Sequence, residues 1–229
     1  MTMWAVLVAA GSGDRLAADR PKAFVRLGDR PLVAESLERL ERSDWVDAIV
    51  VAVPEGWEEP AILLAEELGA GKVFQAVTGG AIRAESVRLA MDEVPADATA
   101  VLVHDAARPL LPPEVIERVL EPLGEGWDAV VPVLPVTDTI KRVERDVVAE
   151  TVPRDGLVAA QTPQAFGADT LRAALAGDSD AASDCASLVE ARGGRVKVVE
   201  GDPRLLKVTT AHDLQVLEAM LASEQEAPR

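Results

Sequence analysis

Cysteine, histidine and tyrosine are scarce in this chain of 229 residues, which holds one Cys, two His and no Tyr. The single Cys185 excludes a disulfide framework within the chain and is typical of a reducing compartment. One Cys and two His are too few for a zinc site of the usual composition. The sequence also lacks an apolar run of transmembrane length and a basic, then apolar, leader. We therefore expect a soluble, cytoplasmic protein.

Positive charge is in deficit as well, because 23 Lys and Arg stand against 39 Asp and Glu, a net charge of −16. This balance argues against nucleic acid and an anionic membrane as partners. The amino-terminal stretch departs from this acidic balance, because Arg15 and Lys22 follow closely after a glycine loop. We therefore expect a local anion site there, and interpret Arg20, Arg26 and Arg30 as ordinary solvated charges.

Short apolar runs alternate with helical patterns along the chain. Strands are expected at residues 4–9, 48–53, 72–76, 100–103, 129–133 and 196–200. Helices are expected at 31–42, 58–68, 84–93, 113–120, 170–176, 186–192 and 211–222. This order predicts a single α/β domain over 1–229, built on a mostly parallel twisted sheet flanked by helices on both faces. Ligands bind such sheets beyond the carboxyl ends of the strands, so the loops after residues 9 and 103 should share one edge.

Residues 135–160 break this alternation. Two extended segments, 139–143 and 147–152, flank a polar turn at 144–146, which predicts a β-hairpin arm that projects from the sheet. An isolated two-stranded hairpin is marginally stable in water. We therefore predict a homodimer formed through the arm, with a hairpin folded back on its own domain as the alternative.

The first predicted strand ends at Gly11-Ser12-Gly13, and two cations, Arg15 and Lys22, follow. Glycine allows close approach of a ligand to the backbone, and successive free N–H groups form an anion-binding concavity. The loop is neither a Walker A motif nor a complete dinucleotide fingerprint. Two glycines after a strand are equally typical of a tight turn, but the added cations favour a nucleoside triphosphate whose α-phosphate is attacked.

A second motif, His104-Asp105-Ala-Ala-Arg108-Pro109, follows the fourth predicted strand. An Asp at a strand end can hold Mg²⁺, and Arg108 can clamp a phosphate through two parallel hydrogen bonds. Taken alone, the motif is explained as well by a surface pair between Asp105 and Arg108. We interpret His104 as structural, because no neighbouring residue completes a nucleophile–base pair.

Three shorter motifs are compatible with ligand binding or with simple turns. Gly80 permits close approach of a base or ribose that Ser86 can hydrogen-bond, although a glycine turn before a helix explains both residues. Thr162 lies in a predicted turn and can donate to a phosphate. Lys207 ends a short apolar run before threonines that can cap the following helix.

Together these blocks resemble the 2-C-methyl-D-erythritol 4-phosphate cytidylyltransferase family of non-mevalonate isoprenoid biosynthesis. They follow the family order over nearly the whole chain. The first block is shared with many sugar nucleotidyltransferases, whereas the His-Asp-Ala-Ala-Arg-Pro and Thr-x-x-Arg blocks are narrower. The matching segments are Ala9-Ala-Gly-Ser-Gly-Asp-Arg15, Pro21-Lys22, Gly79-Gly-x-x-Arg83-x-x-Ser86, His104-Asp-Ala-Ala-Arg-Pro109, Asp138-Thr139-x-Lys141, Thr151-x-x-Arg154, Thr162-Pro-Gln164 and Lys207-Val-Thr209.

The resemblance implies a Rossmann-like nucleotidyltransferase fold and a Mg²⁺-dependent transfer of a cytidylyl group from CTP to methylerythritol phosphate. Catalytic roles fall to Arg15, Lys22 and Lys207, and the metal to Asp105. The implied CTP-binding residues are Ala9, Ala10, Gly11, Ser12, Gly13, Gly80, Arg83 and Ser86. The implied residues for the second substrate are Asp105, Arg108, Thr139, Arg154 and Thr162, of which the arm residues would reach into a partner's site.

Two other functions remain open from the sequence. A cytidylyltransferase acting on ribitol 5-phosphate shares the scaffold, but the Ala-Ala pair before Arg108 and the segment from Thr151 to Arg154 favour methylerythritol phosphate. A non-catalytic nucleotide-binding module would bind CTP without turnover. The joint presence of Arg15, Lys22, Asp105 and Lys207 argues against that module.

Overall fold

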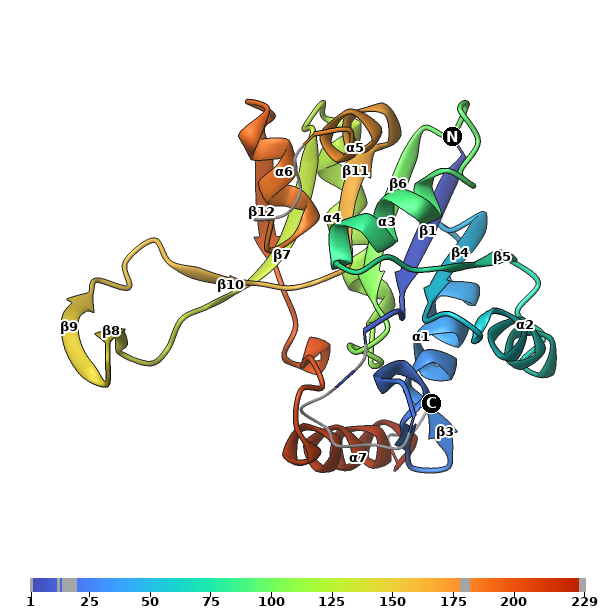
Figure 1. The fold of residues 1–229 in the computed structure, drawn as a ribbon, viewed down its shortest axis with the longest axis horizontal. Helices are drawn as coiled ribbons and strands as arrows, with labels where there is room; N and C mark the ends of the chain where they lie inside the picture. The colour runs from blue at the N-terminus through green and yellow to red at the C-terminus, as the bar shows by residue number, and fades with distance from the viewer. Residues whose placement is uncertain (1, 12, 14–19, 178–181, 227–229) are drawn as a thin grey trace.

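The apolar runs of the sequence form the strands of one twisted sheet, seen in Figure 1. The computed structural model describes residues 2–11, 13, 20–177 and 182–226. Four strands run parallel in the order β6-β1-β4-β5. Their bounds are β1 (Met3–Val8), β4 (Ala48–Val53), β5 (Val73–Thr78) and β6 (Ala100–Asp105). The prediction of a mostly parallel α/β sheet is confirmed.

The remaining strands interrupt the parallel order. β11 (Gln164–Gly167) lies antiparallel between β6 and β7 (Ala129–Pro135), and β10 (Val158–Ala160) is antiparallel to β7. β12 (Val196–Glu200) pairs with β7 in parallel. A small ribbon joins β2 (Arg26–Leu27) to β3 (Arg30–Pro31). The sequence did not predict β2, β3, β10 or β11, because two to four residues are too few to show a period.

All seven predicted helices are present, with ends that shift by a few residues. α1 (Leu32–Glu41), α2 (Glu58–Glu67) and α4 (Pro113–Gly124) contribute to the core on one face of the sheet. α3 (Arg83–Met91), α5 (Ala168–Leu175) and α6 (Cys185–Ala191) contribute to the core on the other. α7 (Ala211–Glu226) packs near the β2–β3 ribbon through Leu217. Within the described residues, no helix has the length and apolar character needed to cross a membrane.

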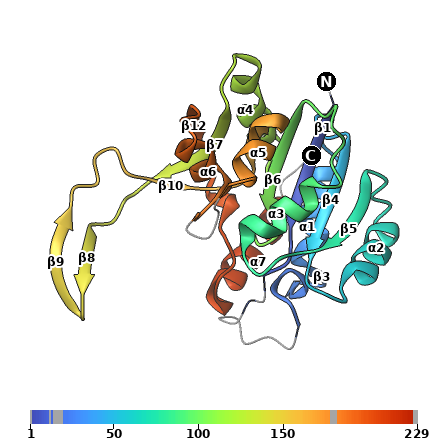
Figure 2. The ribbon, with the colours of Figure 1, turned by 45° about the horizontal axis from the view of Figure 1, so that its top comes forward.

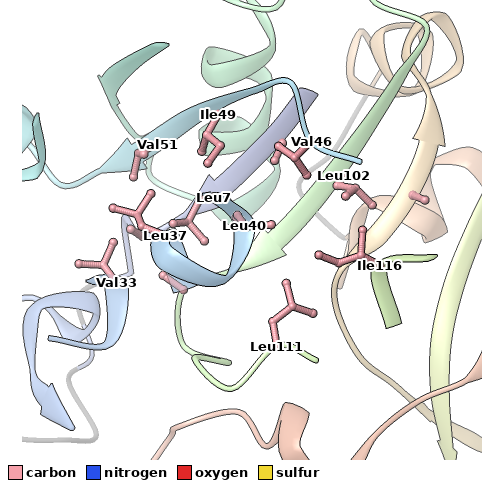
Figure 3. Packing of buried hydrophobic residues seen from close by; sticks show 14 of the residues in the cluster. Leu7, Val33, Leu37, Leu40, Val46, Ile49, Val51, Leu102, Leu111 and Ile116 are labelled. Carbon is pink, nitrogen blue, oxygen red and sulfur yellow. The ribbon is translucent and has the colours of Figure 1, made fainter. Parts of the chain in front are cut away.

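Alternate residues of the central strands enter opposite cores. Leu7 and Ile49 pack on the face that Figure 3 shows, together with Leu37 and Leu40 of α1. Their neighbour Val6 packs against α3 on the opposite face. Burial on both faces explains why these strands are continuous apolar runs rather than alternating ones. The polar ends of the strands are therefore left to form the site.

The predicted arm is present as a separate two-stranded sheet of β8 (Ile140–Glu144) and β9 (Val147–Val152). Its turn places Arg145 and Asp146 at φ of 46° and 69°, the two positive values of a type I′ hairpin turn. Figures 1 and 2 show the arm projecting away from the main sheet beyond β10. The two segments that lead to and from the arm meet at the edge of the main sheet, where Val158 pairs with Pro135.

Candidate active site

The carboxyl ends of β1 and β6 open on one cavity of about 480 Å³. Val8 pairs with Asp105 across these two strands, so the first glycine loop and the His104–Pro109 motif share an edge, as predicted. The cavity is lined by the predicted residues Ala9, Ala10, Gly11, Gly13, Lys22, Gly80, Arg83, Ser86, Asp105 and Lys207. The predicted residues Ser12 and Arg15 lie outside the described residues. The motifs are therefore neighbours in space although they span some 200 positions of sequence.

Asp105 is the electrostatic centre of the cavity and is 5% exposed. Its Oδ1 accepts from Arg83 Nε at 2.9 Å, and its Oδ2 accepts from Lys207 Nζ at 2.7 Å. Burial alone would raise the pKa of this carboxyl, but the facing Arg83 and Lys207 hold it well below its ordinary value. Asp105 is therefore ionised at neutral pH and carries one negative charge against two cations.

Lys22 enters the cavity from the short 3-10 helix η2 (Lys22–Phe24). The glycine loop packs directly against it, because a Cβ on Gly13 would lie 2.5 Å from Lys22 Cβ. Gly13 also has φ of +76°, which L side chains rarely adopt. Glycine at position 13 therefore satisfies both the backbone conformation and the close approach of the lysine.

The loop between β5 and α3 forms another wall of the cavity, with Gly80 and Ala81 in its lining. Ser86 Oγ accepts from Gly80 N at 3.0 Å and donates to the Ile82 carbonyl at 3.1 Å. Glu85 Oε2 accepts from Ala81 N at 2.8 Å. Side chains in the first turn of α3 thus hold the backbone N–H groups of Gly80 and Ala81.

A second cavity of about 200 Å³ adjoins the first and shares Arg83, Asp105 and Lys207 with it. Arg108 and Thr162 line it as well. Arg108 Nη1 donates to the Leu205 carbonyl at 2.6 Å, which ties the phosphate motif to the segment that carries Lys207. Within the described chain, Arg83 Nη2 and Arg108 Nε are buried without a hydrogen-bond partner. Buried donors of this kind are costly unless a ligand satisfies them, so they favour an anion in this cavity.

His104 lies behind this cavity and is fully buried. Its Nε2 is 3.0 Å from the Arg108 carbonyl, which can only accept, so the Nε2 carries the proton and Nδ1 accepts from Thr162 Oγ1 at 3.1 Å. Thr162 Oγ1 in turn accepts from Asp105 N at 3.0 Å. Burial lowers the pKa of His104 to about 4, and the negative charge of Asp105 offsets only part of this decrease. A neutral His104 thus braces the loop, which agrees with its interpretation as structural.

Thr139 and Arg154 do not reach either cavity within one chain. Both are exposed on the arm segment. Arg154 lines a shallow hollow at the base of the arm and donates to the Thr137 carbonyl there. The arm residues are therefore separated from Asp105 and Arg108, in contrast to the other predicted residues.

Gln164 and Asp184 line the second cavity, and Cys185 contacts Arg83 of that cavity, although none of the three was predicted as a site residue. Cys185 Sγ lies 3.4 Å from Arg83 Nη1, and Gln164 Nε2 donates to Asp184 Oδ2 at 2.6 Å. Asp184 also caps α6 by accepting from Ser187 N at 2.9 Å. The sequence assigned no role to Asp184, because its contact to Gln164 depends on the pairing of β11 with β6. The described residues contain no cluster of three or more His, Cys, Asp or Glu that could hold a metal alone.

Comparisons with known proteins agree with this geometry. Residues 3–223 match the family model IspD, described as 2-C-methyl-D-erythritol 4-phosphate cytidylyltransferase. The enzyme of that name from Saccharopolyspora erythraea is 48% identical over 227 residues, covering 97% of this chain and all of the relative. Its counterpart from Frankia casuarinae is 46% identical over 221 residues, covering 95% of this chain and 80% of the relative.

Solved structures show the same relationship. A crystal structure of 2-C-methyl-D-erythritol 4-phosphate cytidylyltransferase from Thermus thermophilus is 35% identical, with a TM-score of 0.77 over 95% of this chain and 98% of that one. A crystal structure of 4-diphosphocytidyl-2C-methyl-D-erythritol synthase is 33% identical, with a TM-score of 0.80 over 96% and 98%. With this fold, these motifs and these matches, the chain belongs to the 2-C-methyl-D-erythritol 4-phosphate cytidylyltransferase family.

Proposed function

We propose that this chain transfers the cytidylyl group of CTP to 2-C-methyl-D-erythritol 4-phosphate, releasing pyrophosphate in isoprenoid biosynthesis. The observation that carries the proposal is the pair of adjoining cavities with Arg83, Asp105 and Lys207 in their common wall. The larger cavity suits CTP between the two glycine loops. The smaller one suits the phosphate of the second substrate beside Arg108. The family membership and the named relatives support this assignment.

The chemistry requires little proton transfer. The second pKa of a phosphomonoester is about 6, so its oxygen is already a nucleophile at neutral pH. One phosphate oxygen attacks the α-phosphorus of CTP in line, and the bond to the bridging oxygen of pyrophosphate breaks. Because an anion approaches a polyanion, the barrier is mainly electrostatic, and positioned cations lower it. Lys22 neutralises the α-phosphate and the leaving group, and Lys207 neutralises the reacting bridge.

From the sequence alone, Arg15 is predicted to share the role of Lys22. Arg108 orients the attacking phosphate, and Thr162 braces that loop through His104. Lys207 starts in an ion pair with Asp105, with 2.7 Å between Nζ and Oδ2. Transfer of this ammonium from a carboxylate to a triphosphate costs little, since both are anionic oxygens.

We propose Mg²⁺ as the metal of this reaction, held by Asp105 together with phosphate oxygens. Mg²⁺ is usually bound by one or two carboxylates, substrate phosphates and water rather than by an all-protein cage. The donor set agrees with this mode: Asp105 is ionised, and it is the one acid among the described residues that line the larger cavity. When bound, the metal neutralises charge on the phosphates and aligns the leaving group.

Pyrophosphate release measured with a panel of nucleotides and sugar phosphates tests the function. Turnover of CTP with methylerythritol phosphate is expected, with strong loss of rate upon chelation of divalent cations by EDTA. Turnover with ribitol 5-phosphate alone would assign the chain to the related cytidylyltransferase. Binding of CTP without any pyrophosphate release would identify a non-catalytic module. The predicted cytoplasmic location stays a prediction.

The arm supports a proposal that the active form is a homodimer. Three apolar side chains of the arm are more than half exposed, namely Val143 at 57%, Val147 at 68% and Val148 at 55%. An exposed hairpin with an apolar surface is typical of a segment that a partner covers. A second copy would also bring Thr139 and Arg154 to the cavity that they do not reach in their own chain. The dimer therefore completes the site for the second substrate.

Mixing of two inactive variants tests the shared site. Arg108→Ala disables the cavity, and Arg154→Ala disables the arm. In a re-equilibrated equal mixture, half of the dimers are mixed and one site of each is intact, so about a quarter of wild-type activity should return. Recovery near zero would show that Arg154 serves the cavity of its own chain or none. Sedimentation of the wild type provides the control for dimer formation.

A further inference from the structure

The loop of Gly79, Gly80 and Ala81 forms part of the cavity wall. The N–H groups of Gly80 and Ala81 both donate to side chains in the first turn of α3. Gly80 N donates to Ser86 Oγ at 3.0 Å, and Ala81 N donates to Glu85 Oε2 at 2.8 Å. Ser86 is part of the cavity lining, but Glu85 is not. Glu85 therefore acts on the wall from behind.

The contact to Glu85 sets the direction of one peptide unit. In a planar trans peptide the N–H and the C=O point in opposite directions. Because the Ala81 N–H points to the Glu85 carboxylate, the Gly80 carbonyl of the same unit points away from it. That carbonyl oxygen accepts from Ser86 Oγ at 3.5 Å, and both Gly80 and Ser86 line the cavity. The donor of this peptide unit is thus held by Glu85, and its acceptor lies beside Ser86 of the cavity wall.

The space around Gly80 shows that Glu85 packs across this peptide. A Cβ on Gly80 would lie 2.2 Å from Glu85 Cγ and 2.4 Å from Glu85 Oε2. Only a glycine leaves room for the carboxylate to reach the Ala81 N–H. The bond and the packing are independent observations that bring the same two elements together.

We propose that Glu85 is a positioning residue for the nucleotide, which holds the Gly80–Ala81 peptide with its carbonyl available to the base. This inference rests on the proposed function, because it takes CTP as the occupant of the larger cavity. Cytosine carries an exocyclic amino group where uracil carries an oxygen. A carbonyl held toward that position accepts a hydrogen bond from cytosine and repels uracil. Glu85 therefore contributes to selection of CTP over UTP without touching either nucleotide.

Four variants test the proposal by steady-state pyrophosphate release. Glu85→Ala removes the acceptor, and Gly80→Ala displaces the carboxylate from the opposite side. Glu85→Gln keeps an acceptor oxygen but removes the charge. Asp92→Ala is the matched control, since it removes an acid at the other end of α3 whose partner is the exposed Arg88.

Glu85→Ala and Gly80→Ala should each raise the KM for CTP by about tenfold, the size expected for loss of one hydrogen bond to a charged group. The KM for methylerythritol phosphate should stay within about twofold, and the ratio of kcat/KM for CTP over UTP should fall by about tenfold. Glu85→Gln should restore both values, and Asp92→Ala should change neither. Equal loss of kcat for both nucleotides, or a Glu85→Gln variant as impaired as Glu85→Ala, would overturn the proposal.

Calorimetric binding of CTP and UTP separates this inference from the proposed function. If the wild type releases no pyrophosphate, the proposed function fails, and the same variants still report on the loop through their dissociation constants. Weaker CTP binding by Glu85→Ala, with UTP binding unchanged or tighter, is then the expected result. Unchanged CTP binding in both Glu85→Ala and Gly80→Ala would overturn the positioning role.

Discussion

The two cavities meet at Asp105, and this junction holds its polar groups in a different way from the arm. At the junction, Asp105 is 5% exposed and has cations at 2.9 Å and 2.7 Å. In the arm, the ion pair between Arg142 and Glu150 joins side chains that are 62% and 53% exposed. Burial strengthens the first set of interactions, whereas solvent screens the second. One chain therefore preorganises the cavity for CTP, whereas in the proposed dimer the arm takes its position from a partner.

The largest expected effect comes from exchanging one lysine at the junction. Lys22→Ala should lower kcat by roughly 100- to 1000-fold, or about 2.7–4 kcal/mol of transition-state energy, because a positioned cation is lost from the developing charge. Lys141→Ala in the arm is the matched control, since Lys141 is exposed and its Nζ donates to Thr151 Oγ1 within the arm. Single-turnover rates measure both. Near-normal kcat in Lys22→Ala would remove the distinction between the two regions.

Acid should weaken the junction through His104. The pKa of His104 is about 4 in the fold, against an ordinary value near 6.5, so the unfolded chain binds a proton first as the pH falls. The associated stability is present above pH 6.5 and is lost as the pH falls toward 4, by roughly 3 kcal/mol at most. Asp105, whose pKa is lowered, adds its own loss only below the ordinary range of an Asp.

Urea unfolding at several pH values measures this effect. His104→Gln should be less stable than the wild type at pH 7.5, yet show a flatter loss between pH 6.5 and 4.5. His212→Gln on α7 is the control, because His212 is exposed. An unchanged pH slope in His104→Gln would contradict the assignment of this acid sensitivity to the junction.

The arm should respond through assembly rather than stability. Val143 and Val148 are paired across the hairpin and exposed. The double change Val143→Lys with Val148→Lys should dissociate the dimer and lower kcat/KM for methylerythritol phosphate by about tenfold, with the unfolding midpoint unchanged. Val198→Lys, at a residue 54% exposed on β12, is the control. Sedimentation that still shows a dimer would place the interface elsewhere.

The smallest effect is expected at the exposed ion pair of the arm. A double-mutant cycle with Arg142→Ala and Glu150→Ala should give a coupling below about 0.5 kcal/mol in the free energy of unfolding. The reason is that both side chains remain largely in water. A coupling above about 1 kcal/mol would show that the arm is ordered within its own chain, as the site around Asp105 is.

Most of the fold was predictable because its strands are buried on both faces. The runs of β1, β4 and β6 are continuous and apolar, and the parallel order brings the glycine loop after β1 and the polar end of β6 to one edge. Lys207 and Asp105 were both predicted as site residues, but their ion pair was not. It depends on the Val208 N–H donating to the Ala107 carbonyl at 2.8 Å, a long-range contact with no local pattern.

The short antiparallel strands were not predictable for a related reason. β11 comprises four residues that pair with both β6 and β7, and its place follows from tertiary packing of Phe166 rather than from a period in sequence. Glu85 was overlooked because an acid in the first turn of a helix is ordinarily explained by the helix dipole. The packing of its side chain against Gly80 is visible only in three dimensions.

The pairing of Val158 with Pro135 gives the arm adjacent points of departure and return. An insertion anchored in this way can be lengthened, exchanged or deleted in evolution while the eight strands behind it keep their register. Selection for a new sugar-alcohol phosphate as acceptor would then act on a detachable module, and the nucleotide side of the enzyme would be inherited unchanged.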